Sequence, residues 1–142
     1  MSTSPDPGTL AAGHEIPAFV RPTGLALWNR YAAVNDEFVP IHMDDEAGRE
    51  AGYPSAFGMG NLQVSFLHSL LRQWMGDDGR IVSVACQFRG PNLKGQTITT
   101  RGRITAVRPG ADRVEIDLEV WTENQDGEVL APGTATVSVP AG

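Results

Sequence analysis

The fold of this protein depends on one stretch of its sequence, Gly58-Met-Gly-Asn-Leu-Gln-Val-Ser-Phe-Leu-His-Ser-Leu-Leu-Arg-Gln-Trp-Met75. Apolar side chains recur in it at intervals of three and four residues: Met59, Leu62, Phe66, Leu67, Leu70, Leu71, Trp74 and Met75. That spacing predicts one wide apolar stripe on a helix of about four to five turns. Gly76 follows directly and is expected to end the helix as a C′ glycine.

The second half of the chain alternates apolar and polar residues, as strands do. The clearest run covers 114–120, with further runs at 82–88, 96–107 and 128–139 and turn-forming connectors at 109–112 and 124–127. They predict an antiparallel meander of about four strands after the long helix, with Gly102 marking a bulge or bend. Because such a sheet can curl around the helix, the sequence predicts an α+β hot-dog fold, a long central helix wrapped by a curved antiparallel sheet. An open edge strand would favour pairing into a dimer.

The first half of the chain supplies shorter elements. Residues 1–13 are rich in Ser, Thr, Pro and Gly and are expected to form a flexible N-terminal arm, so that 14–142 make a single domain. Residues 14–20 predict a short edge strand or a loop.

Two helices are expected before the long one. Thr23 is a candidate N-cap for the first, which ends at Asn35. Pro40 is expected to hold the next segment extended, and Asp44 or Asp45 to cap a short helix over 46–50.

The composition excludes several classes of protein. The net charge of −6 over 142 residues argues against general nucleic-acid binding, which needs a basic surface. No apolar run approaches the roughly 20 residues of a membrane span, so we expect no membrane helix. A single cysteine, Cys86, excludes an intrachain disulfide. These features predict a cytoplasmic protein.

The segment before the long helix contains the chemically active side chains. It reads Tyr31-Ala-Ala-Val-Asn-Asp-Glu-Phe-Val-Pro-Ile-His-Met-Asp44, with two carboxylates and a histidine in a short turn. A glycine-containing turn that opens the long helix follows. Carboxylate, imidazole and free backbone N–H groups are what proton transfer beside a polarised carbonyl requires.

These residues resemble the MaoC-like dehydratase family of hot-dog proteins, which includes R-specific enoyl-CoA hydratases. The resemblance covers about residues 23–139, and its matching positions are Tyr31-Ala32, Pro40, His42, Asp44, Gly52, Gly58-Met59, Phe88-Arg89-Gly90-Pro91 and Lys94-Gly95. Read without gaps, the catalytic Asp of the family falls on Glu37 and its preceding glycine on Asp36. The family's Asn before the proline is Val39 here, and its His before the Gly-Met pair is Phe57.

The resemblance implies an acyl-CoA substrate and a reversible addition of water across a 2-enoyl thioester. Glu37, or Asp36 if the turn is one residue longer, would act with His42 on one water. The N–H groups of Gly58 and Met59 would bind the thioester oxygen. No metal or redox cofactor is implied, and a homodimer or a heteromer with another hot-dog subunit is expected.

Roles in substrate binding are also expected. Phe38, Phe57 and Asn61 are candidates for the substrate pocket, and Arg89 and Lys94 for the CoA phosphates. Without the resemblance, the sequence favours reading His42 as an ordinary loop histidine, hydrogen-bonded to Asp44 or to a carbonyl. The altered signature also fits a non-catalytic subunit that shapes the acyl tunnel of an active partner.

Overall fold

The computed structural model describes residues 3–142. Its elements in chain order are η1 (Pro7–Thr9), β1 (Glu15–Pro22), α1 (Leu25–Asn35), η2 (Pro40–His42), α2 (Asp45–Glu50), α3 (Gly60–Met75), β2 (Arg80–Cys86), β3 (Thr97–Arg108), β4 (Arg113–Glu123) and β5 (Val129–Pro140). The strands form one antiparallel sheet in the order β1-β3-β4-β5-β2.

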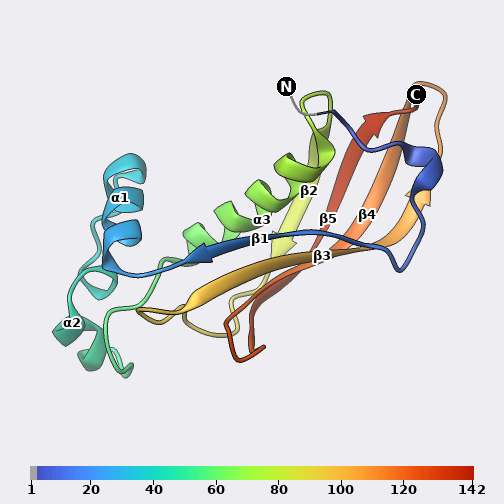
Figure 1. The fold of residues 1–142 in the computed structure, drawn as a ribbon. Coiled ribbons are helices and arrows are strands. Elements are labelled where there is room, and N and C mark those ends of the chain that lie inside the picture. Colours follow the sequence, from blue (N-terminus) through green and yellow to red (C-terminus); the bar gives the residue numbers. More distant parts are fainter. Residues whose placement is uncertain (1–2) are drawn as a thin grey trace.

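The helix α3 lies along one face of this sheet and contacts all five strands, while α1 and α2 gather at one end of the molecule (Figure 1). The predicted α+β hot-dog arrangement is therefore confirmed. The predicted strand order is not. β2 pairs with β5 rather than with its successor β3. Of the two possibilities expected for residues 14–20, the edge strand is correct, because β1 lies at the edge of the sheet beside β3.

The apolar stripe of α3 forms the centre of the core. Its buried side chains include Leu62, Phe66, Leu67, Leu70, Leu71 and Met75, and they pack with inward-facing residues such as Ile98, Ile116 and Val137 of the sheet. Gly76 ends the helix as expected. One residue of the buried face is polar, because Gln63 is only 3% exposed.

Several local expectations need correction. Gly24, not Thr23, is the N-cap of α1, and the Thr23 hydroxyl instead donates to the Gln96 carbonyl at 2.7 Å. Pro40 opens the 3₁₀ turn η2 instead of an extended segment, because a fixed φ suits the first position of a helical turn.

Gly102 borders an irregularity, but the extra residue lies in β1, whose register against β3 shifts between Ile16, the partner of Gly102, and Phe19. Within β3 the register against β4 shifts between Ile104 and Ala106. Gly102 also leaves room for Ile16, because a Cβ there would lie 3.0 Å from the Ile16 Cδ1.

The described part of the N-terminal segment contacts the domain. Leu10 packs against the core, and the Gly13 N–H donates to the Ile104 carbonyl at 2.8 Å. Residues 1 and 2, which belong to the expected flexible arm, lie outside the described residues. Within residues 3–142, no helix is both long and apolar enough to cross a bilayer.

Candidate active site

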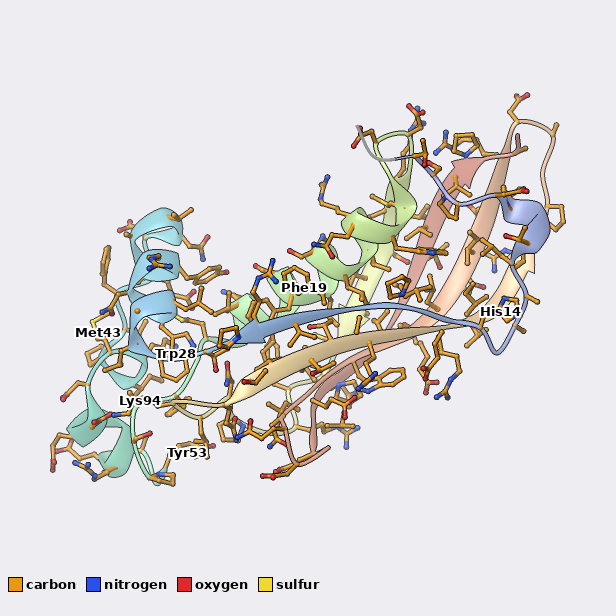
Figure 2. All side chains as sticks on the ribbon, viewed as in Figure 1. His14, Phe19, Trp28, Met43, Tyr53 and Lys94 are labelled. Atoms are coloured by element: carbon orange, nitrogen blue, oxygen red, sulfur yellow. The ribbon has the colours of Figure 1, made fainter. Side chains whose placement is uncertain are left out.

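A cavity of about 260 Å³ opens between η2, the turn before α3 and the segment that follows β2. It is lined by His42, Tyr53, Phe57, Gly58, Gly60, Gln63, Phe88, Arg89, Gly90 and Pro91. The labelled side chains of Tyr53, Trp28, Met43 and Lys94 lie at this end of the molecule, which carries α1 and α2, whereas His14 lies at the opposite end (Figure 2). The cavity thus occupies the region where the sequence motif and the start of α3 meet.

His42 is a buried titratable side chain of this cavity, and a hydrogen bond holds its ring in place. It is 8% exposed, and its Nδ1 lies 2.8 Å from the Phe57 carbonyl oxygen. A carbonyl only accepts, so Nδ1 carries the hydrogen and the neutral imidazole keeps its lone pair on Nε2. The bond fixes both the tautomer and the orientation of the ring.

The local sequence explains why His42 points inward. Pro40 starts the single turn of η2, and the His42 N–H donates to the Val39 carbonyl at 3.0 Å. Asp44 then caps α2, as predicted, because its carboxylate accepts from the Glu46 and Ala47 N–H groups. The histidine is held between two structured turns.

The two candidate acids lie at the end of α1. Asp36 has φ 53° and ψ 41°, the left-handed conformation that glycine adopts most easily at a helix C-terminus. Glu37 follows half-buried, and its Oε2 accepts from Asn35 Nδ2 at 3.3 Å. Neither acid lines the cavity, and none of the hydrogen bonds within residues 3–142 joins either one to His42.

The turn that opens α3 offers fewer free donors than expected. The Gly58 N–H already donates to the Asn92 carbonyl at 2.7 Å, so it is not free for a ligand in this structure. The Met59 N–H precedes the first turn of α3 and finds no acceptor in the described part of the chain. The positive end of the helix dipole also lies there.

The expected pocket residues divide between two places. Phe57 lines the cavity, and its ring meets the His42 ring edge-on at 5.6 Å. Phe38 is 61% exposed, and Asn61 lines a separate groove between α1 and α3 with His68. Phe88, 55% exposed, also lines the cavity, although only its match to the family's strand pointed to it.

The two candidate phosphate ligands also separate. Arg89 lines the cavity, while its guanidinium donates to Gln87 Oε1 at 2.5 Å. Lys94 pairs with Asp45 at 2.6 Å. The hydrogen bond from Lys94 holds the pKa of the Asp45 carboxyl below its usual value. Lys94 therefore ties the start of α2 to the loop before β3.

The chain is similar to a known protein family and to one of its characterised members. The family model described as "MaoC like domain" matches residues 14–125. The (R)-specific enoyl-CoA hydratase of Aeromonas caviae is 25% identical over 118 residues, which cover 82% of this chain and 87% of that protein.

Two solved structures show the same fold. The (R)-hydratase from A. caviae superposes with a TM-score of 0.83 at 23% identity, covering 93% of this chain and 98% of that one. The ChsH1-ChsH2 complex from Mycobacterium tuberculosis gives a TM-score of 0.81 at 20% identity, covering 91% of this chain and 98% of that one.

Proposed function

Because this chain belongs to the MaoC-like domain family, we propose that it is an acyl-CoA hydratase/dehydratase, which adds water reversibly across a 2-enoyl thioester. The observation that carries the proposal is His42. Its Nδ1–H is bound to the Phe57 carbonyl, so Nε2 is left as an acceptor at a cavity beside the start of α3. A buried histidine with one fixed tautomer suits general base catalysis.

In the proposed reaction, His42 and a carboxylate hold one water beneath the C2–C3 double bond. One of the pair accepts a proton from the water as the water oxygen bonds to C3. The other delivers a proton to C2, and proton exchange between them restores both groups. Dehydration is the reverse, and no cofactor takes part.

Glu37 is the proposed carboxylate. Asp36 falls where the family's signature has a glycine, and it adopts the left-handed conformation that glycine takes most easily, which supports the gap-free reading. Glu37 is also the less exposed of the two. Asp36 is the alternative, and substitution separates them.

The N–H of Met59 is the proposed backbone donor to the thioester oxygen. It lies at the N-terminus of α3 and is unengaged among the described residues. Negative charge that develops on the oxygen would be stabilised there by the helix dipole.

The test is hydration of crotonyl-CoA, followed by loss of the enoyl-thioester absorbance. His42→Ala is expected to lower kcat by about 10²- to 10⁴-fold, the usual contribution of a general acid or base. Glu37→Gln should do the same, whereas Asp36→Asn should keep most of the rate.

His14→Ala is the matched control, because His14 lies at the far end of the molecule (Figure 2). Full activity of the His42→Ala variant would refute the mechanism. A loss confined to Asp36→Asn would instead assign the carboxylate to that residue.

A second candidate function is a non-catalytic subunit that shapes the acyl tunnel of an active hot-dog partner. It is favoured by Val39 and Phe57, which replace the Asn and His of the family's signature. The structural relative ChsH1-ChsH2 is itself a complex of two named chains. Absence of turnover by the purified protein across acyl lengths, with turnover regained on adding a partner chain, would support this reading.

A further inference from the structure

A polar side chain interrupts the buried face of α3. Gln63 is 3% exposed, although its neighbours Leu62, Phe66 and Leu67 are all apolar and buried. It also lines the cavity that contains His42. Its position is therefore between the core and the candidate active site.

The amide of Gln63 is oriented from the sheet. Thr122 of β4 is fully buried, and its hydroxyl donates to Gln63 Oε1 at 2.5 Å. The amide oxygen is thus occupied. The Nε2 group has no acceptor among the described residues, and it is not one of the enclosed polar atoms of the core. Its two N–H donors are available to a molecule in the cavity.

This polar cluster is costly to bury. Thr100 faces Thr122 across the β3–β4 pairing, is also fully buried, and its hydroxyl has no partner. Apolar residues at these positions would pack without unpaired donors. A ligand that accepts from Gln63 gives the cluster a function.

The direction of the side chain indicates which atom of the ligand it meets. Helical side chains lean toward the N-terminus of their helix, so the Gln63 amide covers the first turn of α3. The Met59 N–H lies at that turn, and the Gly58 N–H is already bound to Asn92.

From this arrangement we propose that Gln63 Nε2 is a side-chain donor to the thioester oxygen, acting beside the Met59 N–H. The inference rests on the proposed function, because it assumes that the cavity binds an acyl thioester. Thr122 is then a positioning residue, which keeps the amide nitrogen turned toward the cavity.

The first test measures turnover. Crotonyl-CoA is the probe, because its acyl group contains no oxygen other than the thioester oxygen. Gln63→Met keeps the size of the side chain and removes the donor, and it is expected to lower kcat by about 100-fold or more with a smaller change in KM. Thr122→Val should cause a smaller loss of kcat, because the amide remains but can rotate.

Gln73→Met is the matched control, since Gln73 lies on the exposed face of the same helix, and it should keep the wild-type rate. If Gln63→Met does not fold, the double variant Gln63→Met/Thr122→Val is assayed in its place. The double variant removes both partners of the buried hydrogen bond and leaves neither one unpaired. An unchanged kcat in the folded variant would overturn the inference.

A second test does not depend on turnover. Butyryl-CoA labelled with ¹³C at the thioester carbonyl is a saturated, unreactive ligand whose carbonyl stretch can be followed by difference infrared spectroscopy. The band of the bound ligand should lie at lower frequency in the wild type than in Gln63→Met, because hydrogen bonds weaken the C=O bond.

The two tests separate the inference from the proposed function. A wild-type protein that binds butyryl-CoA with the frequency difference but hydrates no enoyl-CoA of any acyl length supports the Gln63 contact and refutes the enzymatic role. Equal frequencies in the two proteins, or no binding of butyryl-CoA by the wild type, would overturn the Gln63 contact.

Discussion

At the scale of single residues, Gly58 lies where two buried side chains leave little room for a Cβ. A Cβ there would lie 2.9 Å from Trp28 Nε1 and 3.1 Å from Asn92 Oδ1, and both side chains are buried. Gly58→Ala is therefore expected to destabilise the protein by about 1–3 kcal/mol, the usual cost of overpacking, as measured by the denaturant midpoint. Gly60→Ala is the control, since its Cβ would meet the exposed ring of Phe88, which can move. Equal stability of the two variants would contradict this.

The sequence predicts some site residues and misses others for a physical reason. His42 and the glycine turn are found because their chemistry depends on short-range spacing. The position of Gln63 is not predicted, because an amphipathic pattern does not show which polar residue of α3 faces inward. Only Thr122, 59 residues away along the chain, reveals that Gln63 is buried and oriented.

At the scale of elements, α2 depends on its N-cap. The Asp44 carboxylate accepts from the Glu46 and Ala47 N–H groups, each at 3.3 Å. Asp44→Ala should lower the free energy of unfolding by about 1 kcal/mol, as loss of a cap commonly does. Urea denaturation measures it, with Glu50→Ala, an exposed acid at the other end of α2, as the control. If the Asp44 cap did not contribute to stability, Asp44→Ala and Glu50→Ala would give superimposable unfolding curves.

Elements were predicted better than their pairing. Periodicity places α3 and the four later strands, because side-chain burial repeats along each element. It does not show that β2 pairs with β5, since the pairing depends on contacts between distant segments. The single turn η2 is also not predicted, because Pro40 suits both an extended segment and the start of a helical turn.

At the scale of the whole molecule, ion pairs on the sheet predict how stability depends on pH. The Arg108 guanidinium, followed by the Thr136 hydroxyl, holds the pKa of the Asp117 carboxyl below its ordinary value of 3.8. A lowered native pKa contributes stability above that ordinary value, and the contribution is lost as the pH falls through the native pKa. Thermal unfolding should therefore show a falling Tm below about pH 4, with a shallower fall in Asp117→Asn. Equal slopes for the two proteins would contradict this role of Asp117.

The burial of Trp28 against Gly58 has a practical consequence. Its indole is fully enclosed, and the nitrogen lies beside the backbone of the turn that opens α3. Indole emission responds to small changes in its surroundings, so the chain contains a native optical reporter next to the cavity. Titration with an unlabelled acyl thioester could then be followed by fluorescence, without attaching any dye.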